Sequence, residues 1–280
     1  MPKRLAKDAE RPLWQLREQY EIEKSLANRL RSAGQAERRP LYTSVYDELY
    51  RRVPHHPQLT RKADKTVQLE SVSKQVAFLR QFLSGSSIFM EIGPGDCRLS
   101  VEIAGMVEKV YAVDVSHEIT KRTLPRNCEL IISDGCNIPL PNQKVNVAYS
   151  NHLMEHLHPD DAINQVRNIY DVLADGGVYV CITPNRLNGP HDISQYFDEV
   201  ASGFHLKEYT ITELTGIFRA TGFRKVSAHI SVKGPFLEIP LGLITWLEAV
   251  LIQLPFALSN RIARWLPVKL LLAARVVGVK

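Results

Sequence analysis

The chain has 280 residues, which suffices for one large α/β domain with attachments but is short for two independent cores of ordinary size. Its composition, 45% hydrophobic and 23% charged, is that of a globular protein and excludes global disorder. The net charge of +5 is uneven, because residues 1–65 hold 15 Lys and Arg against 9 Asp and Glu, and residues 236–280 hold 5 against 2. Basic ends of this kind are more typical of solvated surface than of a nucleic-acid interface.

The cysteines and the N-terminal residues indicate a reducing compartment. None of the cysteines has CxxC spacing, and the first residues are charged, unlike the apolar stretch of a secretory signal. We therefore expect reduced thiols and a cytoplasmic protein. The four cysteines are Cys97, Cys128, Cys136 and Cys181.

Helical periodicity dominates the first 85 residues. Apolar side chains recur at helical spacing over 13–33, 42–53 and 66–83, and a glycine or proline follows each stretch. These patterns predict three helices. We expect residues 1–65 to form an N-terminal helical extension.

From residue 88 the pattern changes to short apolar runs separated by helical segments. This alternation is typical of βαβ units and predicts a doubly wound, mostly parallel sheet, with residues 66–234 as its core. Thr210 and Glu213 have the spacing of a capping box that opens a helix. The predicted strands cover residues 88–92, 110–115, 129–132, 145–150, 177–182 and 225–232.

The C-terminal part predicts an apolar helical insertion over residues 235–270 and a terminal strand over 271–280. The apolar stretch is interrupted by Glu248 and Pro255, so it falls short of the roughly 20 apolar residues that span a bilayer. Basic and tryptophan residues follow it, which suits a membrane surface. A lid or a dimer contact explains the same pattern equally well.

A glycine-rich turn follows the first predicted strand. In the segment Glu91-Ile-Gly-Pro-Gly-Asp96, Gly93 and Gly95 allow close approach of a ligand to the backbone. Asp114 ends the second strand, 19 residues beyond Gly95, where a carboxylate can accept hydrogen bonds from both hydroxyls of a ribose. A dinucleotide site requires a third glycine where this chain has Arg98, so NAD is disfavoured.

A second acidic turn, Asp134-Gly135, follows the third strand. The Asp134 carboxylate could accept a hydrogen bond from the adenine amino group of the same nucleoside, and Gly135 leaves the backbone open to it. Ligands of open α/β sheets bind at the carboxyl ends of the strands, where all these turns meet.

These segments together resemble the class I S-adenosylmethionine-dependent methyltransferases over about residues 70–232. The resemblance also includes Tyr149 to His156 at the end of the fourth strand and Leu173 to Pro184; Cys97 departs from it, since many members have a glycine there. It implies S-adenosylmethionine as cofactor and a seven-stranded sheet of order 3-2-1-4-5-7-6. The implied cofactor-binding residues are Glu91, near the methionine amino group, with Gly93, Pro94, Gly95, Asp114, Val115, Asp134, Gly135 and Asn151.

Several histidines follow the fourth and fifth strands. If the acceptor is a hydroxyl, a base near it assists transfer, and we consider His152 and His191 the candidates. His156 is interpreted as a packing residue and His205 as a loop anchor. No metal site is evident in the sequence.

The acceptor class follows from motifs that are present and absent. The (Asp/Asn)-Pro-Pro-(Tyr/Phe) signature of base-amino methyltransferases and a Pro-Cys nucleophile are both missing, which disfavours nucleic acid. Tyr42, Tyr46 and Tyr50 could stack on bases, but their four-residue spacing favours a packed stripe. Residues 185–197 resemble methyltransferases of cell-envelope saccharides.

We therefore expect methyl transfer to an oxygen of a saccharide or lipid-linked acceptor, with peripheral contact of residues 241–270 to the inner face of the membrane. A quinone-like or other apolar small molecule is the alternative acceptor. A non-catalytic protein that only binds S-adenosylmethionine is a further alternative. The sequence leaves the oligomeric state open.

Overall fold

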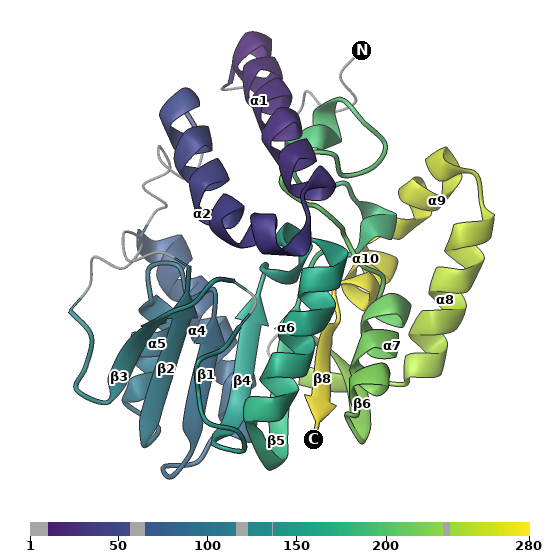
Figure 1. The fold of residues 1–280 in the computed structure, drawn as a ribbon. Coiled ribbons are helices and arrows are strands. Elements are labelled where there is room, and N and C mark those ends of the chain that lie inside the picture. The colour runs from purple at the N-terminus through teal and green to yellow at the C-terminus, as the bar shows by residue number, and fades with distance from the viewer. Residues whose placement is uncertain (1–10, 57–64, 116–122, 136, 232–235) are drawn as a thin grey trace.

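A mixed sheet of eight strands forms the centre of the protein (Figure 1). The computed structural model describes residues 11–56, 65–115, 123–135, 137–231 and 236–280, so Ser116 and Cys136 lie outside the described residues. The strand order is β3-β2-β1-β4-β5-β8-β6-β7. The strands are β1 (Ile88–Ile92), β2 (Lys109–Asp114), β3 (Cys128–Ile132), β4 (Val145–Asn151), β5 (Leu173–Ile182), β6 (Lys225–Ser231), β7 (Phe236–Ile239) and β8 (Arg275–Val279).

The topology confirms the predicted fold with one addition. Strands β1 to β5 pair in parallel, and β8 pairs antiparallel with both β5 and β6, which is the predicted order when β8 is counted as the seventh strand. The sheet has eight strands because Phe236–Ile239 pairs antiparallel with β6, at the start of the segment predicted to be helical. Four residues at a sheet edge carry too short an alternation to be distinguished from a helix by sequence.

Two layers of helices cover the sheet. Alternate residues of each strand face opposite sides, so Phe89, Val110 and Val180 pack against one layer while Met90 and Tyr179 pack against the other. The first layer contains α4 (Lys65–Leu79), η1 (Arg80–Phe82) and α5 (Arg98–Ala104). The second contains α6 (Pro159–Val172) and α7 (Ile211–Thr221), which lie in front of the sheet in Figure 1.

Helices α6 and α7 begin with the sequence signals expected of helix starts. Pro159 takes the first position of α6. The predicted capping box at α7 is confirmed, since Thr210 Oγ1 accepts from the Glu213 amide and the Glu213 carboxylate accepts from the Thr210 amide. Gly222 closes the helix at φ 119°, a conformation that glycine adopts without strain.

The N-terminal helices α1 (Leu13–Ser32) and α2 (Gln35–Arg52) lie across the carboxyl ends of the strands (Figure 1). Leu26 and Leu30 of α1 pack with Val45 and Leu49 of α2, and all four belong to the main core. Helix α2 begins seven residues before the predicted stretch and contains Pro40. These two helices therefore form the wall above the sheet edge where ligands of this fold class bind.

The apolar C-terminal insertion folds into three short helices, α8 (Leu241–Gln253), α9 (Phe256–Ala263) and α10 (Leu266–Leu272). Their inner faces form a small core that includes Leu187 of the long β5–α7 connection, residues 183–210. Among the described residues, no helix is long and apolar enough to cross a membrane.

Candidate functional site

A cavity of about 490 Å³ lies at the carboxyl ends of β1, β2 and β4, beneath α2. Several residues predicted to bind the cofactor line it together, although they are far apart in sequence. Its lining includes Gly93, Gly95, Asp114, Val115, Gly135 and His152 of the predicted site, with Tyr42, Thr43, Tyr46, Asp47, Tyr50, Ser133, Asn137, Leu153, His156 and Gln165.

The glycine turn after β1 has the backbone that its sequence predicts. Gly93 and Gly95 have φ values of 70° and 54°, in the left-handed region that favours glycine. A Cβ on Gly93 would lie 3.1 Å from a methyl carbon of Leu153, whereas a Cβ on Gly95 would have no atom within 4 Å. The turn therefore gives the cavity an open face of backbone, and Pro94 between the two glycines is buried.

Asp114 stands at the end of β2 with its side chain fixed. Its Oδ1 accepts a hydrogen bond from the Val115 amide at 2.7 Å, and the residue is only 8% exposed. A carboxylate held in this way at the wall of the cavity has the chemistry required to accept from ribose hydroxyls.

The turn after β3 presents its backbone to the cavity and its acidic side chain elsewhere. Gly135 lines the cavity, and its carbonyl accepts from Gln165 Nε2 at 2.7 Å. The Asp134 carboxylate accepts from the amide and the side chain of Asn137 at 2.7 and 2.6 Å and lies 3.4 Å from Arg39 Nε. Asn137, rather than Asp134, lines the cavity.

Glu91 lies within the sheet behind the glycine turn and is 6% exposed. Burial raises the pKa of this carboxyl from 4.5 to about 7, and the hydrogen bond that it accepts from Ser100 Oγ opposes the rise only in part. Asn151 ends β4, paired with Ile182 of β5, and neither it nor Glu91 is among the cavity-lining residues.

The tyrosine stripe of α2 faces the cavity, which the sequence did not reveal. Tyr42, Tyr46 and Tyr50 all line it, and all three also pack with the main core, as their spacing predicted. Their four-residue spacing showed that they share a helix face but gave no information about what that face covers. The N-terminal extension is thus part of the candidate site.

His152 lies in the cavity beside the glycine turn. It has a φ of 55°, and its Nδ1 is 3.0 Å from Oε1 of the fully buried Glu155. Burial alone would raise the pKa of Glu155, but the hydrogen bond from His152 and the neighbouring histidines outweigh it and hold that pKa below its usual value. Glu155 therefore orients the His152 ring as a carboxylate partner.

A second cavity of about 280 Å³ adjoins the first, since Tyr46 and His156 line both. His191 lines the second cavity and is absent from the lining of the first. Most of the second lining is polar, and it comprises Arg11, Gln19, Glu23, Tyr46, Leu49, His56, His156, His191, Asp192, Ile193, Gln195, Tyr196, Phe204 and His205.

Glu208 supports the histidines of the second cavity. Its carboxylate lies 2.7 Å from His205 Nδ1 and 3.2 Å from His191 Nδ1. Burial would raise the pKa of Glu208, but these two hydrogen bonds lower it to about 2. The carboxylate is therefore ionised and fixes both rings.

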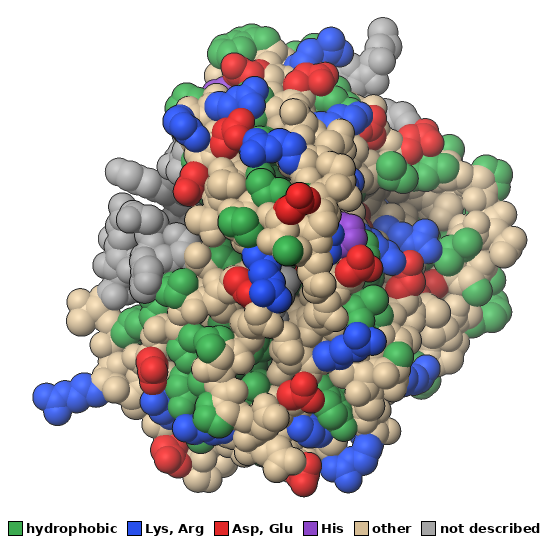
Figure 2. Space-filling model, in the orientation of Figure 1, with side chains coloured by type: hydrophobic (Ala, Val, Ile, Leu, Met, Phe, Trp, Pro, Cys, Tyr) green, Lys and Arg blue, Asp and Glu red, His purple; other side chains and the backbone are tan. Residues whose placement is uncertain are grey.

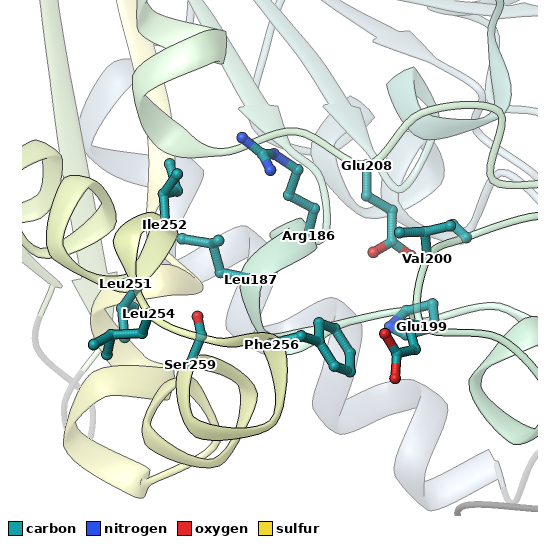
Figure 3. Close-up of a pocket in the computed structure, with 12 residues that line it drawn as sticks. Arg186, Leu187, Glu199, Val200, Glu208, Leu251, Ile252, Leu254, Phe256 and Ser259 are labelled. Carbon is teal, nitrogen blue, oxygen red and sulfur yellow. The ribbon is translucent and has the colours of Figure 1, made fainter.

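A third cavity of about 330 Å³ lies between the β5–α7 connection and helices α8 and α9 (Figure 3). Leu187, Val200, Leu251, Leu254 and Phe256 give it a mainly apolar lining. Glu208 also lines it, so one carboxylate borders this cavity and supports the histidines of the polar one.

Comparison with known proteins identifies the family. Residues 63–228, more than half of the chain, match a family described as a methyltransferase domain. A Mycolicibacterium smegmatis protein named "Probable S-adenosylmethionine-dependent methyltransferase" is 29% identical over 136 residues, which are 48% of this chain and 51% of that protein. The chain thus spans about half the length of this curated relative.

Two solved structures show the same fold. A methyltransferase from Archaeoglobus fulgidus superimposes with a TM-score of 0.51 at 17% identity, covering 75% of this chain and 94% of that one. One from Thermotoga maritima gives a TM-score of 0.52 at 13% identity and covers 94% of this chain and 99% of that one. The family match shows, and the shared fold and the glycine turn agree, that the chain belongs to the class I S-adenosylmethionine-dependent methyltransferase family.

Proposed function

We propose that the 490 Å³ cavity binds S-adenosylmethionine and that the enzyme transfers its methyl group to an oxygen of a saccharide or lipid-linked acceptor. In this proposal Asp114 accepts from the ribose hydroxyls, and the turn Gly93-Pro94-Gly95 lies against the methionine part. Val115 and the Asp134-Gly135 turn border the adenosine. Glu91 and Asn151 support the same edge of the sheet from behind the lining.

The observation that carries the acceptor proposal is the polar cavity that shares Tyr46 and His156 with the cofactor cavity. An acceptor must reach the methyl group from a neighbouring space, because the transfer is an in-line displacement. The side chains of that space include His191, Asp192 and Gln195, which provide both donors and acceptors. Such a lining suits the many hydroxyls of a saccharide better than a quinone-like ring.

The apolar cavity behind Glu208 supports a lipid-linked acceptor over a free sugar. It lies on the far side of the carboxylate that fixes His191 and His205, and its walls come from α8, α9 and the connection (Figure 3). A lipid chain in this cavity would have its head group directed to the polar cavity.

The outer surface of the insertion supports peripheral contact with a membrane. Hydrophobic side chains gather along the edge formed by α8 and α9, at the right of the molecule in Figure 2. Trp246 and Trp265 are 64% and 65% exposed, and Arg261 and Lys269 accompany them on α9 and α10. Exposed apolar residues beside basic ones are typical of surfaces that bind anionic lipid.

We assign His152 as the general base and His191 as the second candidate. S-adenosylmethionine, when bound, supplies an electrophilic methyl group on a sulfonium. Glu155 holds the His152 ring through Nδ1, which leaves Nε2 to take the proton of an acceptor hydroxyl. By taking that proton, His152 would make the acceptor oxygen a better nucleophile toward the methyl group that the bound cofactor would supply.

The test is methyl transfer from radiolabelled S-adenosylmethionine to three acceptors: a lipid-linked saccharide, the free saccharide and a short-chain quinol. We expect the highest kcat/KM for the lipid-linked saccharide, and a His152→Gln variant that loses about 100-fold or more in kcat with unchanged cofactor affinity. Preference for the quinol would establish the alternative acceptor. Cofactor binding without transfer to any class of acceptor would favour the non-catalytic protein.

A further inference from the structure

We propose that Glu155, His156 and His205 bind one divalent metal ion of the Zn²⁺ or Mn²⁺ class at the boundary between the cofactor cavity and the polar cavity. Its catalytic role, binding of the acceptor oxygen, rests on the proposed oxygen methylation. Metal binding itself does not.

The three side chains converge from separate parts of the chain. Glu155 and His156 lie in η2 (Met154–His156), directly after β4, and His205 lies on the connection after β5. One ligand atom from each lies within 4.8 Å of the other two. Ligand atoms around an ion at about 2.1 Å are roughly 3 to 3.5 Å apart, so small side-chain rotations would complete the set.

Each histidine has its ring fixed by an acceptor at Nδ1. His156 Nδ1 lies 3.0 Å from the Phe204 carbonyl oxygen, and His205 Nδ1 lies 2.7 Å from Glu208 Oε1. Donation from Nδ1 leaves the Nε2 lone pair as the metal ligand. Such outer partners, a carboxylate or a backbone carbonyl, accompany most metal-binding histidines.

Glu155 is a buried carboxylate whose oxygens have lone pairs left to bind a further partner. It accepts from His152 at 3.0 Å and from Thr183 Oγ1 at 3.0 Å, which occupies two of about four lone-pair positions. Across the described residues its ion-pair partner is a histidine, and no lysine or arginine pairs with it. A bound cation would supply the positive charge that burial of a carboxylate requires.

The position of the cluster gives the ion a function. His156 lines both cavities and His205 lines the polar one, so an ion bound between them lies where an acceptor hydroxyl must meet the methyl group. A divalent ion lowers the pKa of a hydroxyl bound to it. The hydroxyl proton passes to His152 or water, the oxygen bonds to the methyl carbon, and the sulfonium leaves as the neutral thioether.

The experiment measures metal binding without any acceptor. Protein treated with EDTA is titrated calorimetrically with Zn²⁺, Mn²⁺ and Mg²⁺, and Co²⁺ substitution is followed by visible absorption. We expect one Zn²⁺ or Mn²⁺ per chain, and at least a 10-fold weaker affinity in Glu155→Gln and His205→Gln. Glu208→Gln, which removes an outer partner only, should weaken affinity by about 10- to 100-fold.

His229→Gln is the matched control, because His229 is a largely buried histidine on β6 that bonds to Ser227, outside the cluster. It should retain full metal affinity. Binding of S-adenosylhomocysteine and the circular dichroism spectrum establish that each variant is folded. The Co²⁺ spectrum of the unmodified enzyme provides a check that needs no variant.

The outcomes separate this site from the proposed function. No stoichiometric binding by the unmodified enzyme, or binding that His205→Gln leaves unchanged, contradicts the site. Full-rate methylation of a hydroxyl acceptor by metal-free enzyme overturns the catalytic role of the ion. Intact metal binding without methylation of any hydroxyl acceptor supports the site and contradicts the proposed acceptor class.

Discussion

Arg38 and Asp161 form a buried, bidentate ion pair between α2 and α6. Arg38 Nε lies 2.6 Å from one carboxylate oxygen and Nη2 lies 2.9 Å from the other, with the side chains 4% and 0% exposed. Tyr42 donates its hydroxyl to the same carboxylate at 2.7 Å. This contact fixes the helix whose next two tyrosines, Tyr46 and Tyr50, line the 490 Å³ cavity.

Removal of this ion pair should destabilise the protein and weaken cofactor binding. Arg38→Met leaves the Asp161 carboxylate buried without its cation, which typically costs about 3 to 5 kcal/mol of unfolding free energy. Urea unfolding and titration with S-adenosylmethionine measure the two effects. Arg39→Ala is the control for the unfolding measurement. Arg39 is 47% exposed and its Nε lies 3.4 Å from the Asp134 carboxylate, so its replacement should lower the unfolding free energy by no more than about 1 kcal/mol. Equal losses in both variants would contradict the structural role of Arg38.

Glu91 should make the stability of the cofactor-free protein fall as pH rises. The folded-state pKa of about 7 exceeds the ordinary 4.5, so its stabilising contribution is complete below pH 4.5 and is lost as pH rises through 7. The difference between these two pKa values corresponds to about 3 kcal/mol of unfolding free energy. Thermal unfolding of the enzyme and of Glu91→Gln between pH 5 and 8 isolates this group, and parallel pH profiles would refute the assignment.

Glu248 should be the most sensitive position of the insertion. This fully buried carboxylate on α8 accepts from Asn185 Nδ2 at 2.7 Å and from the amides of Ile211 and Thr212 at 2.8 Å, at the N-terminus of α7. Glu248→Ala leaves these donors unpaired, and we expect a loss of about 2 to 4 kcal/mol in urea unfolding. Glu238→Ala is the control, because Glu238 is exposed and its carboxylate lies 3.7 Å from Lys225 Nζ. Its unfolding free energy should be almost unchanged.

The tryptophans of the insertion should govern membrane binding. Flotation with anionic vesicles should recover the unmodified enzyme, and the double variant Trp246→Ser and Trp265→Ser should reduce recovery several-fold. Trp14→Ser is the matched control, because Trp14 is 63% exposed on α1 and lies outside the insertion. An equal effect of the control, or no flotation of the unmodified enzyme, would exclude this surface as a membrane contact.

The sequence predicted the sheet well because its signals are local. Strand-length apolar runs, the glycines after β1 and the capping box at α7 each depend on a few neighbouring residues. Strand β7 was missed because its four residues obtain their structure from pairing with β6. Glu248 interrupted an apolar pattern in the sequence, but its partners at the start of α7 are about 36 residues away.

The candidate site was predicted in part for the same reason. Gly93 and Gly95 follow β1, Asp114 ends β2, and these two strands pair in parallel, so strand topology alone brings the three residues together. The convergence of His156 with His205, and of α2 with the glycine turn, depends on how the connection and the N-terminal helices pack. Residue spacing carries no information about such packing, so the polar cavity could not be predicted from it.

The most direct test of the account is calorimetric titration of the enzyme and of Asp114→Ala with S-adenosylmethionine, with NAD titrated separately. We expect micromolar binding of S-adenosylmethionine alone, and a loss of about 10- to 150-fold in Asp114→Ala, which removes charged hydrogen bonds worth about 1.5 to 3 kcal/mol. Glu129→Ala, an exposed carboxylate paired with Lys109 on β2, should bind normally. Unchanged affinity in Asp114→Ala, or selective binding of NAD, would contradict the cofactor site proposed above.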